Sequence, residues 1–422
     1  MPPARSVRHE SGADLPMTTV AAESRSLLRE RPFLFFLGAR TFSRFASQIA
    51  AVAVGWQVYE LTSSAFILGM IGLVQFLPTA VLVFVAGHAV DRFDRKRVVQ
   101  LCQLAEGLTA VFLAWGTYAG WITVPEIFLA MLVVGTAGAF ESPAVAALLP
   151  AVVPDGTLQR ATATSSGFGQ LATITGPALG GFAYAVAPGL PYLIMAGCWL
   201  IGVILMGAVM LEHRPAETAS PDSDDLYAGF KFVWANPAIL GTISLDLFAV
   251  LLGGATALLP IYARDILHTG PWGLGILRAA PAVGALLMTI VLARHTINRK
   301  VGLRMFQAVI VFGVATAVFA VSTWLWLSLL ALAIMGAADT ISVVIRFSLV
   351  QLATPDAMRG RVGAVNFLFI NASNQLGQFE SGVTAALLGT VPAAVLGGVG
   401  TIAIALLWMK LFPALRKVER LE

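Results

Sequence analysis

The fold of this chain follows from one short stretch, Gly87-His88-Ala89-Val90-Asp91-Arg92-Phe93-Asp94-Arg95-Lys96-Arg97. It lies between two long apolar segments, 66–87 and 98–119. The hydrocarbon core of a bilayer does not accommodate so many charges, which places the stretch in a tight turn at a membrane surface. Because basic residues dominate it, the positive-inside bias predicts that this surface is cytoplasmic.

The composition of the whole chain is also that of a membrane protein. The 422 residues are 58% hydrophobic and 12% charged, whereas a soluble chain carries roughly a quarter charged residues. A helix needs about 20 apolar residues to cross a bilayer, and the runs here are too long and too continuously apolar for a β-barrel. We therefore predict an all-α membrane protein with about twelve transmembrane helices, near 33–58, 66–87, 98–119, 124–150, 161–186, 190–211, 237–262, 273–293, 303–321, 324–352, 362–388 and 391–412.

Weak internal repeats divide these spans into two sets of six. Tyr59 stands near the end of the first span as Tyr262 does in the seventh, and the turn at 153–155 resembles the turn at 354–356. Their shared order indicates two pseudo-symmetric six-helix bundles. The predicted parts are a disordered cytoplasmic tail (1–31), the N-terminal bundle (32–212), a cytoplasmic linker with an amphipathic segment (213–236), the C-terminal bundle (237–412) and a cytoplasmic tail (413–422).

The distribution of basic residues predicts the orientation of the chain. When the N-terminus is placed in the cytoplasm, most Lys and Arg residues fall in cytoplasmic loops, so both termini are expected on that side. The same loops account for the net charge of +4, so no nucleic-acid partner is expected. Residues 1–31 lack the apolar core of a signal peptide.

The charged turn resembles a loop signature of the major facilitator superfamily, with the spacing Gly-x-x-x-Asp-Arg-x-x-Arg-Lys. The chain departs from that signature at Asp94, where a glycine is usual. The resemblance implies the major facilitator fold and a gating loop of Gly87, Asp91, Arg92, Arg95 and Lys96. We expect Asp91 to act as a latch at the N-terminus of the span that begins near 362, whose dipole favours an anion. The basic residues could instead bind anionic lipid headgroups.

A second motif lies in the fifth span, at Gly176, Pro177, Gly180 and Gly181. It is similar to the exporter-associated motif of the superfamily, although Ala172 stands where a glycine is usual. Small residues allow helices to approach closely and Pro177 allows the helix to bend. Ordinary helix packing would give the same residues, so that interpretation stays open.

Three further stretches are similar to the branch of the superfamily that contains the enterobactin exporter and macrolide-type drug exporters. They are 56–64, 259–264 and 353–362. The fourth span lacks the arginine that many proton-coupled drug antiporters carry there, so their coupling mechanism is not carried over to this chain.

Ionisable residues inside the spans are candidates for substrate binding or proton coupling, because charge at bilayer depth is costly unless it is paired or hydrated. In the resembled fold, spans one, four, seven and ten line the central cavity. We hypothesise that Asp246 and Glu141, on opposite halves, exchange arginine partners as the cavity changes sides, and that a carboxylate without a partner takes up a proton. Static ion pairs are the alternative. The candidates are Arg40, Arg44, Glu141, Asp246, Asp339 and Arg346, with Glu106, Arg278 and Glu380 in second rank.

The predicted function is secondary active export of an amphiphilic small molecule by alternating access, coupled to protons, in a bacterial-type inner membrane. Uptake of a small organic solute and lipid flipping by the same fold are the alternatives. An enzyme is not expected, because no phosphate-binding loop is present and the five histidines show no metal-ligand spacing. We expect no cofactor and no metal, membrane lipids as neighbours, and a monomer.

Overall fold

The computed structural model describes residue 27 and residues 29–154, 156–210, 223–295, 299–355 and 358–420. The described residues form helices and no strand, which confirms the predicted all-α class. The predicted N-terminal tail lies almost entirely outside the described residues, as do 211–222 of the linker region.

The first half contains six long helices joined by short turns. Ser64 begins the second of them, because its hydroxyl accepts a hydrogen bond from the Ile67 N–H at 3.4 Å. Gly120, at φ +73°, ends the third in the left-handed conformation that glycine adopts most easily. These helices are α2 (Arg31–Thr62), α3 (Ala65–Arg92), α4 (Arg95–Ala119), α5 (Val124–Leu148, continued by η1, Leu149–Val152), α6 (Leu158–Val186) and α7 (Leu190–Ala208).

The second half begins with the linker helix α8 (Ser223–Ala235) and repeats the pattern with one difference. Its first span is interrupted at Gly253 and Gly254, where α2 is continuous. The interrupted span comprises α9 (Pro237–Leu252), η2 (Ala255–Leu258), α10 (Leu259–Ile261) and η3 (Tyr262–Ile266). The others are α11 (Gly270–Arg294), α12 (Val301–Val321), α13 (Leu325–Ala353), α14 (Arg359–Leu388) and α15 (Thr390–Leu411), followed by the short α16 (Pro413–Arg416).

Nine helical segments of the described chain are long and apolar enough to cross a membrane. Helices α2, α6 and α14 are as long but less apolar, because they carry more polar and charged residues. Together these twelve segments match the twelve predicted spans.

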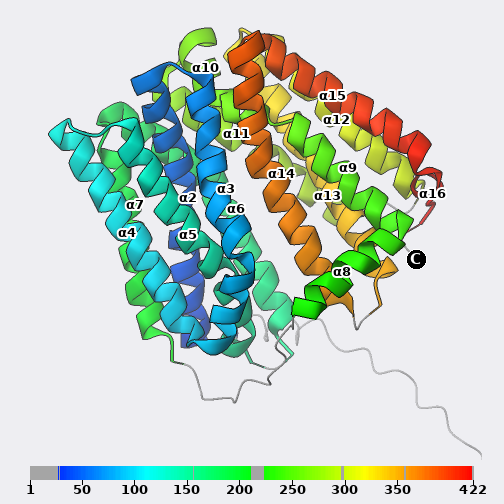
Figure 1. Ribbon diagram of the computed structural model, residues 1–422, viewed down its shortest axis with the longest axis horizontal. Helices are drawn as coiled ribbons and strands as arrows, with labels where there is room; N and C mark the ends of the chain where they lie inside the picture. The colour runs from blue at the N-terminus through cyan, green and yellow to red at the C-terminus, as the bar shows by residue number, and fades with distance from the viewer. Residues whose placement is uncertain are drawn as a thin grey trace, which may run out of the picture.

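The two halves lie side by side, with α2–α7 on the left of Figure 1, α9 and α12–α15 on the right, and α10 and α11 near the middle. In the first half α2 packs on α6 and α7, and α4 packs on α5 and α7. In the second half α9 packs in the same way on α14 and α15, and α12 packs on α13 and α15. Between the halves, α3 meets α14 and α6 meets α11. In the repeat α3 corresponds to α11 and α6 to α14, so each of these two contacts is the symmetry counterpart of the other. The structure therefore has the pseudo-twofold relation that the repeats predicted.

The helix ends define two faces of the molecule. We call the end that carries α8 and the first turn of α2 the linker face, and the end that carries η3 and the turn after Thr62 the far face (Figure 1). Close contacts between the halves lie toward the far face. A Cβ on Gly69 of α3 would meet the Gly382 Cα of α14 at 2.8 Å, and a Cβ on Gly181 of α6 would meet the Pro271 carbonyl oxygen of α11 at 2.5 Å. Only glycine allows these approaches.

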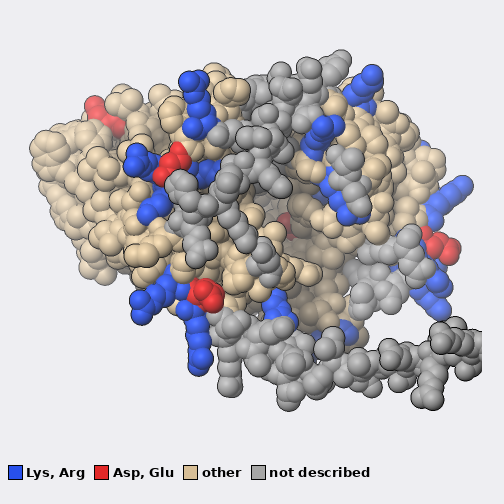
Figure 2. Space-filling view, turned by 90° about the horizontal axis from the view of Figure 1, so that it is seen from below, with Lys and Arg blue, Asp and Glu red and all other residues tan. Residues whose placement is uncertain are grey.

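The linker face shows a different pattern. Lys and Arg side chains are scattered around its rim, few Asp and Glu accompany them, and the surface is hollowed near its middle (Figure 2). The halves are therefore joined tightly near the far face and are less closely joined at the linker face.

Candidate functional site

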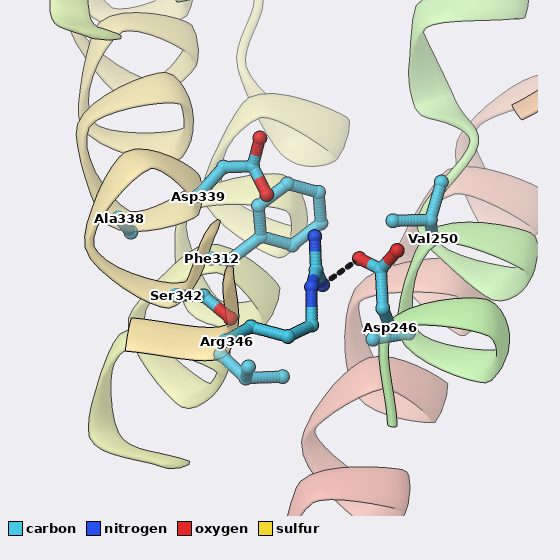
Figure 3. A pocket seen from close by; sticks show the side chains of 9 residues that line it. Asp246, Val250, Phe312, Ala338, Asp339, Ser342 and Arg346 are labelled. Atoms are coloured by element: carbon cyan, nitrogen blue, oxygen red, sulfur yellow. Dashed lines mark ion pairs between the residues drawn. The ribbon is translucent and has the colours of Figure 1, made fainter. Parts of the chain in front are cut away.

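A buried ion pair lies at the centre of the second half. Arg346 of α13 pairs with Asp246 of α9, and the two side chains are only 4% and 9% exposed. They line a small pocket together with Phe312 of α12 and Ser342 of α13 (Figure 3). Both charges are neutralised by this contact in a region that water hardly reaches.

Asp339 faces the same pocket from α13. It stands seven residues before Arg346, which places both side chains on one face of that helix. In Figure 3 the Arg346 guanidinium lies between the Asp339 carboxylate and α9, the helix that carries Asp246. Among the described residues Asp339 has no hydrogen-bond or ion-pair partner. The pocket therefore holds two carboxylates and one guanidinium.

The corresponding region of the first half is built around Glu141 of α5. Its carboxylate accepts hydrogen bonds from the Ser43 hydroxyl of α2 at 3.1 Å and from the Gln103 amide of α4 at 2.9 Å. Glu141 is thus held by neutral donors, whereas Asp246 is held by a cation.

The two sites are related by the internal repeat. Asp246 stands as far before Tyr262 as Ser43 stands before Tyr59, and Ser342 stands as far before Pro355 as Glu141 stands before Pro154. In the first half the hydroxyl is on the first helix and the carboxylate on the fourth. In the second half the carboxylate is on the first helix and the hydroxyl on the fourth.

These positions differ from the predicted arrangement around the central cavity. Asp246 and Asp339 face a pocket among α9, α12 and α13, inside the second bundle. Glu141 contacts α2 and α4, inside the first bundle. Glu141 and Asp246 each have their partners within their own half, and the structure does not bring these two carboxylates together. The sequence pattern missed this because it gives the helix but not the direction of each side chain within the bundle.

Arg40 and Arg44 line a separate cavity of about 190 Å³ between α2 and α6. The two arginines are four residues apart and therefore lie on one face of α2. Among the second-rank residues, Glu106 of α4 is 3% exposed, and its Oε2 has no hydrogen-bond partner among the described residues. Arg278 and Glu380 belong to α11 and α14, and Glu380 accepts a hydrogen bond from the Thr384 hydroxyl at 2.8 Å.

Sequence reasoning missed three polar contributors, Ser43, Gln103 and Ser165. Gln103 could have been found from the sequence, since an amide in the middle of an apolar span needs a hydrogen-bond partner inside the protein. Ser43 and Ser165 give no such signal, because a serine in a helix usually bonds to the carbonyl one turn earlier.

At the far face a polar contact joins the two halves. The Tyr59 hydroxyl at the end of α2 donates a hydrogen bond to Asp265 of η3. Arg264 donates to the Tyr59 carbonyl at 3.1 Å, and its guanidinium lies 5.4 Å from the centre of the Tyr59 ring. These contacts join the first helix of one half to the first span of the other.

The glycine motif of α6 also lies at close helix contacts. Gly176 and Gly180 approach α2, where added Cβ atoms would meet the Gln48 Cβ at 2.7 Å and the Ile49 Cα at 3.2 Å. Gly181 and Pro177 approach Gly275 of α11, since a Cβ on Gly275 would meet the Pro177 carbonyl oxygen at 2.6 Å. The motif thus brings α6 close to its own half and to the opposite one.

The charged turn after α3 docks against its own half. Asp94 caps α4 by accepting a hydrogen bond from the Lys96 N–H at 2.9 Å. The Lys96 ammonium donates to the Gly207 and Val209 carbonyls at the end of α7, and Arg95 donates to the Ala147 carbonyl near the end of α5. Cations are favourable at helix C-termini.

The remaining residues of the predicted gating loop are less constrained. Gly87 has open space where a Cβ would stand, and Arg92 is the last residue of α3. The side chain of Asp91, on which the predicted latch depends, lies outside the part of the chain that the structure describes.

Comparison with known proteins agrees with this architecture. A profile of the Major Facilitator Superfamily matches residues 36–378. The chain belongs to this superfamily. It is therefore a multi-pass membrane transporter for a small molecule and not an enzyme.

Three proteins show how far the superfamily resemblance extends. The chain is 26% identical to the enterobactin exporter EntS of Citrobacter koseri over 399 residues, which are 94% of this chain and 95% of EntS. It is 28% identical to the multidrug efflux pump Tap of Mycolicibacterium fortuitum over 375 residues, or 85% and 90% of the two chains. The nucleoside transporter NupG has the same fold, with a TM-score of 0.71 at 14% identity over 90% of this chain and 100% of NupG.

Proposed function

We propose that this transporter exports an amphiphilic small molecule from the cytoplasm and that proton influx drives the export. The names of two relatives support the direction, because both the enterobactin exporter and the efflux pump Tap align with most of this chain. In this proposal the membrane is a bacterial inner membrane, and both chain ends and the linker face are cytoplasmic. The basic rim of that face supports the orientation (Figure 2).

The proposal assigns the described conformation to the step in which the transporter accepts its cargo. The contacts between Tyr59 and Asp265 and between Gly181 and Gly275 close the side opposite the linker. The substrate then enters from the cytoplasm and leaves after the far-face contacts break, while the halves close at the linker face. Transporters of this kind work by such rocking of two bundles around a site near the midplane.

Proton coupling rests on one observation, the presence of two carboxylates beside one guanidinium. Arg346 neutralises Asp246. A second ionised carboxylate in the same pocket would leave an uncompensated negative charge at bilayer depth, which is strongly disfavoured. In the proposed cycle Asp339 therefore holds a proton in this state and releases it to the cytoplasm when Arg346 turns from Asp246 toward Asp339. Asp246, which loses its partner in that step, takes up a proton from the opposite side once the far face is open, and this proton passes to Asp339 when Arg346 returns to Asp246. This exchange takes place within the second half and replaces the exchange across halves expected from the sequence.

An accumulation assay tests the direction and the driving force. Cells that produce the protein are loaded with enterobactin, erythromycin or ethidium, and retention is measured with and without a protonophore. Export predicts lower retention of at least one compound than in cells with an empty vector, and the protonophore removes the difference. Higher retention would indicate uptake, and a difference that survives the protonophore would contradict proton coupling.

A further inference from the structure

The cavity between α2 and α6 has a character of its own. It measures about 190 Å³ and is separate from the pocket around Asp246. One wall comes from Arg40 and Arg44 of α2, and the facing wall comes from the hydroxyl and amide residues of α6. These α6 residues are Ser165, Ser166, Gln170 and Thr173.

The charge of the cavity is positive. Neither Arg40 nor Arg44 forms an ion pair or a hydrogen bond with another residue of the described chain. Glu141 interacts electrostatically with both arginines, but its carboxylate is already bonded to Ser43 and Gln103. Two guanidinium groups thus face one carboxylate, and their own hydrogen-bond donors are available.

The α6 wall contains a buried hydroxyl without a partner. Ser165 is 3% exposed, and its Oγ makes no hydrogen bond with the described residues. Its neighbours behave differently: the Thr162, Thr164 and Thr173 hydroxyls each donate to the carbonyl four residues earlier. A buried polar group normally has a partner, so Ser165 is placed to bond to something that enters the cavity.

The hydrogen-bond donors of this cavity favour an anionic ligand. A guanidinium presents planar pairs of donors that match the two oxygens of a carboxylate or of a phosphate, and a hydroxyl adds one more donor. Nothing apolar or cationic would use this set of groups. We infer that the α2–α6 cavity binds the anionic head of the transported molecule, so that the substrate of this exporter is an amphiphilic organic anion.

The position of the cavity fits a substrate site. It lies on the linker side of the Gly181–Gly275 contact, because its α6 residues stand between the linker-face end of α6 and Gly181. Its wall also reaches the other half, because the Gln170 amide donates to the Ala282 carbonyl of α11 at 3.1 Å. Separation of α6 from α11 during the cycle would change this wall and release the head group.

The inference rests on the proposed export function, and an equilibrium binding experiment tests it separately. The full chain is placed in nanodiscs of phosphatidylcholine, without any gradient. Two fluorescent probes of equal length are titrated, dansyl-aminoundecanoic acid and its methyl ester. The acid should bind about ten- to a hundredfold more tightly than the ester, because only the acid can form charge-assisted hydrogen bonds.

Variants assign the preference to the cavity. The double variant Arg40→Gln, Arg44→Gln should bind acid and ester equally, while Arg40→Lys, Arg44→Lys should keep part of the preference. Ser165→Ala should weaken the acid only. Arg304→Gln, at an exposed position of α12, is the matched control and should behave as the unaltered chain. Unchanged ester binding shows that each variant is folded.

Three results would overturn the inference. The unaltered chain could bind both probes equally, or the double Gln variant could keep its preference for the acid. Addition of phosphatidylglycerol could displace the acid from the unaltered chain, which would assign the cavity to a lipid phosphate instead of a transported molecule. If any of these results were found while the protein still exported cationic compounds in a proton-driven manner, the proposed export function would hold and only the anion site would be rejected.

Discussion

Arg346 forms its ion pair with Asp246 on a different helix, α9, although Asp339 faces the same pocket from its own helix, α13. The guanidinium therefore connects the first span of the second half to the fourth, and the Asp339 carboxylate lies beside it without an ion-pair partner among the described residues (Figure 3). A small rotation of α9 against α13 would change which carboxylate is paired. This gives a bundle two discrete arrangements, as a switching device requires.

The buried triad should show non-additive stability. Asp246→Asn alone should be tolerated, because Arg346 can turn to Asp339. The double variant Asp246→Asn, Asp339→Asn leaves a buried cation without a partner and should lose about 3–5 kcal/mol. Thermal or denaturant unfolding of the protein in detergent measures the two effects. If the double variant loses no more than the sum of two small single losses, Asp339 is not an alternative partner.

Gly275→Ala should slow transport about tenfold or more, because its Cβ would meet the Pro177 carbonyl oxygen at 2.6 Å and prevent closure of the far face. Gly197→Ala on α7 is the matched control, since a Cβ there would meet no other described part of the chain within 4 Å beyond its own stretch of helix. Efflux rates at equal expression measure the effect. Equal rates for the two variants would show that the α6–α11 contact does not limit the cycle.

Tyr59→Phe should favour the conformation that is open at the far face, because it removes the hydrogen bond to Asp265. A bond to a charged group contributes about 1.5–3 kcal/mol, so the population of that conformation should rise about tenfold or more. Spin labels at Val186 and Trp324, in a background without Cys102 and Cys198, would report the distance between the halves by electron-electron resonance. Tyr118→Phe, at an exposed position of α4, is the control. An unchanged distance distribution in Tyr59→Phe would exclude a latch at this contact.

Asp91→Asn should slow turnover several-fold and leave substrate binding intact, if Asp91 holds the linker face shut in one state through the dipole at the start of α14. Arg97→Gln is a suitable control, because the Arg97 side chain is 82% exposed. Turnover and equilibrium binding are compared for both variants. Loss of binding, or unchanged turnover, would remove the latch.

The sequence predicted most of the fold because the length and hydrophobicity of a segment are enough to identify a membrane-spanning helix. Long runs that are mostly apolar predicted all twelve helices, although three of them carry more polar residues than the rest. Asp94, in the charged turn between two of these helices, caps the second one. The interruption at Gly253 and Gly254 was not predicted, because glycines are common in packed membrane helices and do not by themselves mark a break.

The candidate site was predicted only in part. Charge at bilayer depth identified Asp246, Asp339, Arg346 and Glu141, since each is costly unless it has a function. Their partners could not be predicted, because pairing depends on helix rotation within each bundle. The internal repeat places Ser43 and Asp246 at equivalent positions, but it does not show which residue each of them contacts.

The central claim is that Asp339 carries the proton that drives export. It is tested most directly in proteoliposomes that contain a pH-sensitive dye, in which a gradient of a transported compound is imposed and proton movement is recorded. The unaltered chain should move protons against the flow of the compound, and Asp339→Asn should still exchange the compound but move no protons. Proton movement at the normal rate in Asp339→Asn would contradict the account.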